Sequence, residues 1–564
     1  MNREILGEAC LFMAALFEKH VWPACVGLIS AIAFFAVPAL KAQCPEKPAH
    51  NHSTLAYSFV PNIDGDDTTM HITLTITQSK SNPFDLRMPE PSGKEFVSSW
   101  LNLKAISLGT TISPGESPQY RSVHFKPGTP VVVSYDLQRN FTGKFVYPLQ
   151  FHAVLYPTYF EWFASVALAR PKMNPDDLLT TYYDWTALPR DWSLATSFGA
   201  GMDAASRCQT FTGKRARADQ ALFSGGDFRL HTIKAGARDI TVAIRGSWPF
   251  TDDDALAPIA KSVRAVRAFW KEDGPPYFLV TLAPFDEQGS TDGSGYTNAF
   301  WFFMGPKDDL SIPHIQKDLV HEAFHDWDPA RMGLQVEDQS LSDWFQEGVT
   351  DYYANVIAYR SGLLQTADFV QNINRAITDY YFGKASPYIR GMVIAFWLDN
   401  EIRADSDGKR SLDNIMFDMV HTSGQPLNEQ RVLDTIDKYL TPEDREQLRA
   451  AIDHGTPLPV ASKLEVFPCM SLRNEESNSF DFGLDWPKTR QAKIVTGVEV
   501  NGPAYQADLR DGQQITTWKT QSPDPDKQES ITIKDGENTK EITYYPRKSV
   551  QAPVLHPESC ATTN

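Results

Sequence analysis

The sequence predicts a multidomain α+β protein with a β-rich N-terminal part, a mainly helical second half and a smaller β-rich C-terminal part. A chain of 564 residues exceeds what one hydrophobic core usually organises, so several domains are expected. Up to about residue 250, apolar residues alternate with polar ones or form short β-branched runs. From about residue 311 to 453 the apolar spacing is helical instead. A proline-containing linker at 454–463 precedes the last part.

The strand predictions depend on short apolar runs between proline and glycine clusters. Residues 70–78 ("MHITLTITQ") place Ile72, Leu74 and Ile76 on one face and threonines on the other, which is typical of a half-buried strand. Further strands are expected at 130–137, 192–198, 239–248 and 277–282, and a helix at 253–272. These patterns suggest a β-rich N-terminal domain at 43–250, a second domain at 251–460 and a third at 464–550.

The net charge argues against polyanionic partners, and a well-solvated surface is the alternative interpretation of it. The net charge is −17, from 70 acidic and 53 basic residues. A negative surface repels polyanions, so neither nucleic acid nor an anionic membrane is expected as the main partner. The sequence also contains no G-x-S-x-G elbow and no phosphate-binding P-loop.

The N-terminus resembles an export signal. Residues 21–40 are uncharged and mostly apolar, and the small residue Ala42 follows. This pattern predicts a signal peptide at 1–42 and a periplasmic or secreted protein. The alternative is a membrane-anchored form, because twenty residues can just span a bilayer. Pro23 and Pro38 favour cleavage over the anchor.

Four cysteines follow the predicted signal: Cys44, Cys208, Cys469 and Cys560. An even number in an exported protein indicates disulfides, and three pairings are possible. We favour Cys44–Cys208 and Cys469–Cys560, because each bond would close one domain on itself. Four buried thiols are the alternative.

The stretch "LVHEAFHDW" at 319–327 is the strongest local motif. His321 and His325 are four residues apart, so a helix presents both imidazoles on one face at the reach needed to hold one zinc ion. Glu322 lies about 100° round the helix, where a general base beside the metal is needed. The pattern arises by chance in roughly one or two of every hundred such chains, so a third ligand has to support it.

The segment 340–362 supplies that ligand. Its apolar residues form one helical stripe, and Glu347 faces away from this stripe. Asp351 lies one turn further on the same side. Glu347 is therefore predicted as the third zinc ligand, and Asp351 as the acceptor for the other N–H of a ligand histidine. The alternative for Asp351 is an exposed helix acid.

These residues resemble the gluzincin zinc metallopeptidases. "HEAFH…WFQEGVTDYY" is similar to the H-E-x-x-H…E-G-x-T pattern of the aminopeptidase N relatives and of the glycyl aminopeptidase family, and the second family is the closer match. Residues 387–419 and 188–198 also resemble stretches of that family, and 500–515 ("VNGPAYQADLRDGQQI") resembles a PDZ domain. The resemblance covers most of residues 50–545.

The resemblance implies a thermolysin-like gluzincin catalytic domain at 251–460 and a C-terminal PDZ-like domain at 464–550. It implies one Zn²⁺ per chain, held by His321, His325 and Glu347, with Glu322 as general base. Tyr388 of "PYIRG" matches the tyrosine that donates a hydrogen bond to the oxyanion, and a packing aromatic is the alternative. The partners would be a peptide or protein substrate and, for the PDZ-like domain, a peptide ligand. The alternative role of that domain is to brace the catalytic domain.

One departure concerns the substrate amino group. The family carries an edge strand of the Gly-Gly-x-Glu-His type, whose glutamate holds this group. The corresponding segment here is "GSGYTNAF" at 293–300, with Thr297 and Asn298 in place of Glu and His. Gly295, Tyr296, Thr297 and Asn298 are the candidate substrate-binding residues, and Asp292 or Glu287 are nearby acids that could replace the glutamate.

The sequence therefore predicts a zinc-dependent peptidase, of aminopeptidase type with altered recognition of the substrate N-terminus. Two alternatives remain: a catalytically inactive peptide-binding protein on the same scaffold, and a gluzincin hydrolase of non-peptide bonds. The preferred residue, the exo- or endopeptidase mode and the oligomeric state stay open.

Overall fold

The computed structural model describes residues 44, 53–77, 82–89, 98–333, 342–383, 385–422, 428–459, 464, 466–467, 469–520 and 524–558. The predicted signal peptide at 1–42 lies outside the described residues. Within the described ranges, no helix is both long and apolar enough to cross a membrane.

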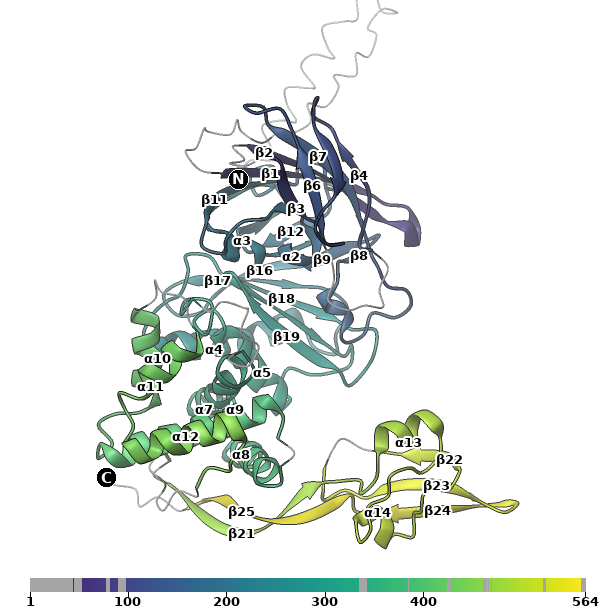
Figure 1. The fold of residues 1–564 in the computed structure, drawn as a ribbon, viewed down its shortest axis with the longest axis vertical. Coiled ribbons are helices and arrows are strands. Elements are labelled where there is room, and N and C mark those ends of the chain that lie inside the picture. The colour runs from purple at the N-terminus through teal and green to yellow at the C-terminus, as the bar shows by residue number, and fades with distance from the viewer. Residues whose placement is uncertain are drawn as a thin grey trace, which may run out of the picture. The chain divides into compact units, whose positions relative to one another are not determined.

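Two β-sheets of the N-terminal part share one core (Figure 1). The strand orders are β14-β11-β1-β2-β7-β4 and β10-β3-β6-β5. The alternation predicted for β2 is confirmed, because Ile72, Leu74 and Ile76 are buried while the threonines between them are partly exposed. The strands are β1 (Ser53–Asn62), β2 (Thr69–Thr77), β3 (Phe84–Arg87), β4 (Trp100–Ala105), β5 (Thr111–Pro114), β6 (Tyr120–His124), β7 (Val131–Gln138), β10 (Arg170–Pro171), β11 (Leu178–Asp184) and β14 (Cys208–Lys214).

A third sheet, of order β13-β12-β15-β9-β8, contributes to two cores. In β9, Phe160 and Trp162 join the core of the first two sheets. Tyr159 of the same strand joins a second core, together with residues from the sheet that follows in the chain. The elements are η2 (Leu149–Phe151), β8 (Val154–Tyr156), β9 (Tyr159–Phe163), α2 (Ala164–Ala167), β12 (Ser193–Thr196), β13 (Gly199–Gly201), α3 (Arg215–Asp219) and β15 (Leu222–Gly226).

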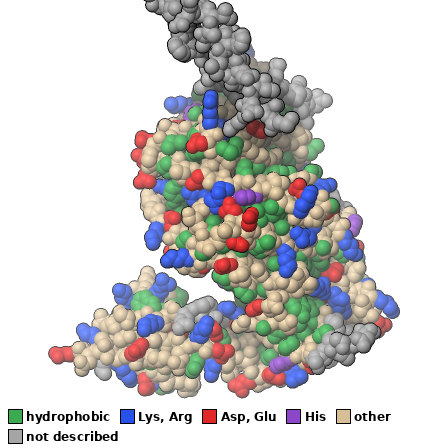
Figure 2. Space-filling model, turned by 180° about the vertical axis from the view of Figure 1, so that it is seen from behind, with side chains coloured by type: hydrophobic (Ala, Val, Ile, Leu, Met, Phe, Trp, Pro, Cys, Tyr) green, Lys and Arg blue, Asp and Glu red, His purple; other side chains and the backbone are tan. Residues whose placement is uncertain are grey.

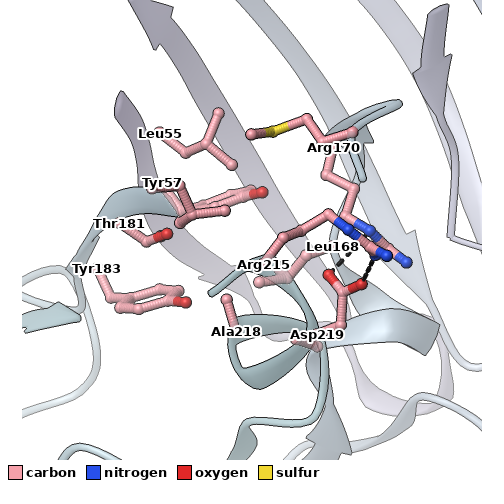
Figure 3. A pocket seen from close by; sticks show the side chains of 12 residues that line it. Leu55, Tyr57, Leu168, Arg170, Thr181, Tyr183, Arg215, Ala218 and Asp219 are labelled. Atoms are coloured by element: carbon pink, nitrogen blue, oxygen red, sulfur yellow. Dashed lines mark hydrogen bonds and ion pairs between the residues drawn. The ribbon is translucent and has the colours of Figure 1, made fainter. Parts of the chain in front are cut away.

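A buried ion cluster links β10 to α3 beside a small cavity (Figure 3). Arg170 Nε lies 2.8 Å from Asp219 Oδ1, and Arg215 pairs with the other oxygen of the same carboxylate. Burial raises the pKa of Asp219, although both arginines oppose this effect. Leu55 and Tyr57 are among the apolar residues that line the rest of the cavity.

A disulfide joins Cys44 to Cys208, which confirms the first predicted pairing. The two Cα atoms are 5.4 Å apart, and the bond ties the chain ahead of β1 to the first residue of β14. Cys469 is also disulfide-bonded, but Cys560 of the second predicted pairing lies outside the described residues.

The sheet that positions the metal motif has the order β16-β17-β18-β20-β19. β17, β18 and β20 run parallel, and β19 pairs antiparallel with β20 at the edge. The sheet begins before the expected domain boundary at residue 251, because β16 and β17 pair into it. The elements are β16 (Arg229–Lys234), β17 (Asp239–Ile244), α4 (Asp252–Trp270), β18 (Leu279–Pro284), β19 (Thr291–Tyr296) and β20 (Ala299–Met304). Thr251 and Asp254 form a capping box that starts α4.

Helices from the second half pack on this sheet and share its core (Figure 1). They are α5 (Pro313–Phe324), η3 (Ser342–Val349), α7 (Thr350–Arg360), α8 (Thr366–Tyr381), α9 (Pro387–Asp405), α10 (Leu412–His421), α11 (Glu429–Ile436) and α12 (Pro442–His454). The predicted helical character of 311–453 is confirmed over the described residues, with one difference. The helix expected at 340–362 begins as the π-helix η3 and continues as α7.

A two-stranded antiparallel ribbon connects the C-terminal module to the helical half of the chain. β21 (Met470–Phe480) pairs antiparallel with β25 (Arg547–Pro557). β25 is tied to α8, since Asn374 Nδ2 donates to Leu555 O (3.0 Å) and Leu555 N donates to Asn374 Oδ1 (2.6 Å). Between the two strands lie α13 (Trp486–Ala492), α14 (Pro503–Gln506), β22 (Ile515–Lys519), β23 (Glu529–Asp535) and β24 (Asn538–Tyr544), around a separate core.

Figure 2 shows acidic and basic side chains interspersed over the visible face of the molecule.

Candidate metal centre

α5 carries the histidine motif on a helix that is held firmly in the core. Pro313 occupies its first turn, where a missing N–H is tolerated. Leu319 and Phe324 are fully buried and anchor it against the sheet and its helices. His321 lies in the last turn of the helix, and His325 is the residue at which the helix ends. The two side chains are nearly inaccessible, with 8% and 7% exposed.

Glycines in the edge strand allow β19 to lie directly against α5. A Cβ atom on Gly293 would come within 2.4 Å of Glu322 Cγ, and one on Gly295 within 2.3 Å of His325 Cβ. Real Cβ atoms essentially never come that close, so larger residues would push the strand away. The structure thus brings Gly295, a predicted substrate-binding residue, beside the metal motif.

Three candidate ligand atoms converge at one point. His325 Nε2 lies 3.0 Å from His321 Nε2, and Glu347 Oε2 lies 3.2 Å from His321 Nε2 and 3.5 Å from His325 Nε2. Ligand atoms at about 2.0–2.2 Å from a tetrahedral zinc are about 3.3 Å apart. The separations of the three atoms therefore fit a single zinc ion.

The outer nitrogens of both histidines face groups that accept hydrogen bonds. His321 Nδ1 is 3.0 Å from Asp351 Oδ1, and His325 Nδ1 is 2.8 Å from the carbonyl oxygen of Asp328. A backbone carbonyl only accepts, and so does an ionised carboxylate, so each neutral ring carries its proton on Nδ1. Both Nε2 lone pairs then point, with the Glu347 carboxylate, at one place. This donor set fits a metal cation.

The carboxylate of Asp351 is itself held by Lys317, a residue that the sequence reasoning missed. Lys317 Nζ lies 2.8 Å from Asp351 Oδ1 and 3.1 Å from Asp318 Oδ1. Burial opposes the charge of Asp351, but Lys317 and His321 outweigh it and lower the pKa of this carboxyl. Lys317 precedes His321 by four residues, so its place on the same helix face was readable from the spacing.

Glu322 lies among these charges with one free oxygen. Burial raises the pKa of Glu322 to about 7, and Glu347 adds to this effect while the two histidines oppose it. Its Oε2 atom is buried and has no hydrogen-bond partner among the described residues. An oxygen that can exchange a proton near neutral pH is therefore available beside the ligands.

Glu347 comes from η3 and Tyr388 from α9. Gln346 Nε2 donates to Glu347 Oε1 at 2.9 Å, which leaves Oε2 for the metal. Burial opposes ionisation of Glu347, but His325 and His321 lower its pKa. Tyr388 lies in the first turn of α9 with 42% of its surface exposed. Burial raises the pKa of Tyr388, and the negative charge of Glu347 adds to this effect.

The other three predicted substrate-binding residues contact residues outside the ligand set. Tyr296 is buried and stacks on Phe163. Thr297 is fully buried and donates to the carbonyl oxygen of Arg217 at 2.8 Å, and Asn298 Oδ1 accepts from the Arg217 side chain at 3.0 Å. Thr297 and Asn298 form the turn between β19 and β20, so they connect the edge strand to α3 instead of lining the site.

An acid on the edge strand lies among the charged residues around the candidate metal centre. Asp292 occupies β19 and accepts a 2.5 Å hydrogen bond from Gln150 Nε2 of η2. Burial raises the pKa of Asp292 to about 6, and Asp318 and Glu347 add to the shift. Gln150 Oε1 is buried and has no hydrogen-bond partner among the described residues. Asp292 was named as an alternative from the sequence, but Gln150 was not.

The donor set resembles that of the gluzincin zinc metallopeptidases. Residues 316–390 match the family model described as M61 glycyl aminopeptidase, which confirms the predicted resemblance. The matched segment contains the three ligand candidates together with Glu322, Asp351 and Tyr388. The cofactor implied by this match is zinc, in agreement with the prediction. A comparison with curated proteins found no match.

Solved structures share the fold at low sequence identity. An aminopeptidase N family protein from Idiomarina loihiensis aligns over 90% of this chain and 98% of its own, with 15% identity and a TM-score of 0.63. This likeness confirms the multidomain fold with a β-rich N-terminal part and a helical second half. Two further structures align with lower scores. An M1 zinc metallopeptidase from Deinococcus radiodurans aligns over 73% of this chain and 96% of its own, with 14% identity and a TM-score of 0.46. Leukotriene A4 hydrolase from Saccharomyces cerevisiae aligns over 74% of this chain and 68% of its own, with 15% identity and a TM-score of 0.46.

Proposed function

We propose that the protein is a zinc-dependent peptidase that removes residues from the free amino end of a peptide. The observation that carries the proposal is the convergence of His321, His325 and Glu347 beside the buried carboxylate of Glu322, under an edge strand without side chains at Gly293 and Gly295. Zinc bound there would polarise the scissile carbonyl and acidify a water molecule.

The chain's own groups then have separate tasks. Glu322 Oε2 accepts the proton of the attacking water and delivers it to the leaving amine nitrogen. The Tyr388 hydroxyl donates a hydrogen bond to the carbonyl oxygen as negative charge develops on it. Asp351 accepts from His321 Nδ1 and fixes the ring's orientation. The free edge of β19 offers backbone groups to an extended substrate.

Asp292 and Gln150 would recognise the substrate ammonium group in place of the missing family glutamate. The Asp292 carboxylate can form a charge-assisted hydrogen bond, and Gln150 Oε1 offers a second, unused acceptor. Loss of such a bond costs about 1.5–3 kcal/mol, or roughly 10- to 100-fold in binding. The site would therefore prefer peptides with a free amino-terminus.

The remaining predictions complete the proposal. We infer a signal peptide at 1–42, export to the periplasm or cell exterior, and the predicted domains 43–250, 251–460 and 464–550, with β16 and β17 assigned to the second domain because they pair into its sheet. The module between β21 and β25 would be the PDZ-like domain. Its small separate core and its strand–helix content support this assignment.

The test uses two reporter peptides of one sequence, one with a free amino-terminus and one N-acetylated. Wild type, Glu322→Gln and Asp292→Asn are compared, with zinc content measured on each. Glu287→Gln is the matched control, because Glu287 is an exposed acid just ahead of the edge strand. We expect wild type to cut only the free peptide, Glu322→Gln to retain zinc but lose activity, and Asp292→Asn to raise KM roughly 10- to 100-fold.

Other outcomes would contradict specific parts of the proposal. Cleavage of both peptides would refute recognition of the ammonium group by Asp292. Bound zinc without hydrolysis of either peptide would favour the inactive peptide-binding protein or a hydrolase of non-peptide bonds. A folded wild type without zinc would refute the site.

A further inference from the structure

The π-helix that carries Glu347 and the helix that carries Tyr388 cross at a pair of glycines. We propose that this crossing, formed by Gly348 of η3 and Gly391 of α9, is the device that positions the Tyr388 hydroxyl against the metal centre. The inference rests on the role proposed above for Tyr388, and its test separates the two.

The backbones of η3 and α9 approach each other so closely at the crossing that a Cβ atom does not fit between them. A Cβ atom on Gly391 would lie 2.0 Å from the carbonyl oxygen of Trp344 and 2.9 Å from Gly348 Cα. A Cβ atom on Gly348 would lie 2.4 Å from Gly391 Cα. All of these neighbours are backbone atoms, so no side-chain rotation can make room. Among the described residues, neither glycine belongs to those with a positive φ, so the requirement is space.

Glycine within a helix is otherwise unfavourable. It destabilises a helix by about 1 kcal/mol relative to alanine. Both helices carry this cost where their backbones meet, which indicates that the close contact is needed for more than helix formation.

The two glycines stand at fixed offsets from the functional side chains. Glu347 immediately precedes Gly348, and Tyr388 precedes Gly391 by three residues, or about one helical turn. The crossing distance therefore sets how far the phenol lies from the third metal ligand. η3 is a π-helix, a form that is frequent at functional sites, and its Trp344 carbonyl is the atom closest to the added Cβ.

The expected effect of widening the crossing follows from these distances. Contacts under 3.0 Å to a Cβ atom are essentially never seen, so alanine at 391 must move α9 away from η3 by about 1 Å. A misplacement of 1 Å in a catalytic group costs about 100-fold in rate. His321 and His325 lie on α5, so zinc should remain bound.

The activity test is a double-mutant cycle on the zinc-loaded, full-length protein. Gly391→Ala, Tyr388→Phe and the double variant are compared for kcat and KM on the free-amine peptide, with zinc content on each. The matched control is Val393→Ala, which removes a buried side chain of α9 that lines a small cavity with Tyr381 of α8, away from the crossing.

We expect Gly391→Ala to lower kcat about 100-fold with little change in KM, and the double variant to be no slower than Tyr388→Phe alone. Val393→Ala should keep the wild-type kcat even where it unfolds at a lower temperature. A wild-type kcat in Gly391→Ala, or effects that multiply in the double variant, would overturn the proposal.

A spectroscopic readout keeps the inference testable if no peptide is cut. Fluorotyrosine is placed at position 388, and its ¹⁹F resonance is recorded with and without Zn²⁺. We expect zinc to shift the resonance in the otherwise wild-type chain and to shift it much less with Gly391→Ala. Equal shifts in both chains would refute the positioning role. A zinc-dependent shift without peptide hydrolysis would refute only the peptidase function.

Discussion

Glu161 is a buried acid whose ionisation should limit the stability of the protein above neutral pH. It lies in β9, is fully buried, and accepts hydrogen bonds from Ser224 of β15 (3.0 Å) and Thr281 of β18 (2.6 Å) on one oxygen. The other oxygen has no hydrogen-bond partner among the described residues. Because Thr281 belongs to the next sheet, Glu161 joins the N-terminal part to the sheet that bears the metal site.

The size of the expected loss of stability follows from the raised pKa of Glu161. Burial raises the pKa of Glu161 from 4.5 to about 7, against the opposing effects of Thr281, Ser224 and Arg245. The folded state holds the proton more tightly than the unfolded state, so stability is highest below pH 4.5 as far as this group is concerned. It falls as pH rises through 4.5 to 7 and then levels. A rise in pKa from 4.5 to about 7 corresponds to a loss of about 3 kcal/mol in the free energy of unfolding once both states are ionised.

The perturbation is Glu161→Gln, which keeps the shape and removes the ionisation. Thermal unfolding of wild type and variant is measured from pH 5 to 8.5, with Glu287→Gln as an exposed control. We expect the wild-type midpoint to fall with rising pH relative to Glu161→Gln, so that the variant becomes the more stable protein above pH 7. Parallel pH profiles for wild type and Glu161→Gln would show that Glu161 does not ionise with a raised pKa.

Three further predictions concern the metal site and the disulfide. Loss of a hydrogen bond that supports a metal ligand lowers metal affinity roughly 10- to 100-fold. Glu347→Gln removes a ligand itself, so it should weaken zinc binding by more than this, as measured by competition with a chelator. Unchanged zinc affinity would exclude Glu347 as a ligand. Lys317→Met frees Asp351 from its ion pair and should lower zinc affinity roughly 10-fold, whereas Lys317→Arg should restore most of it. Cys44→Ser opens a bond that spans 164 residues and should destabilise the N-terminal part by about 5 kcal/mol on the chain-entropy model. An unfolding midpoint equal to that of the unreduced wild type would contradict this.

The ligand set could be predicted because local periodicity encodes it. His321 and His325 share a face through the four-residue spacing, and Glu347 and Asp351 oppose an apolar stripe on the next helical segment. The structure brings all four together. The π-helical form of residues 342–349 was not predicted, because π-helices are rare and no residue type in so short a segment distinguishes i→i+5 from i→i+4 hydrogen bonding.

The substrate side of the site was predicted less well, for a physical reason. Its residues meet through strand register and long-range contacts, and a short displacement along a strand changes which side chains face the site. Thr297 and Asn298 were matched to the family motif by residue count, yet they form the hairpin turn. Gln150 reaches Asp292 from 142 residues away, and no local pattern in the sequence indicates such a contact.

The ribbon of β21 and β25 has a consequence for how this chain can change. Phe480 and Arg547 face each other in the last pair of the ribbon, and Asp481 N donates to Pro546 O at 2.7 Å just beyond it. The two ends of the inserted module are therefore neighbours. A short turn from Phe480 to Arg547 would replace the whole module and leave the ribbon an ordinary hairpin. We therefore expect that the module can be removed, exchanged or lengthened while the ribbon stays in place.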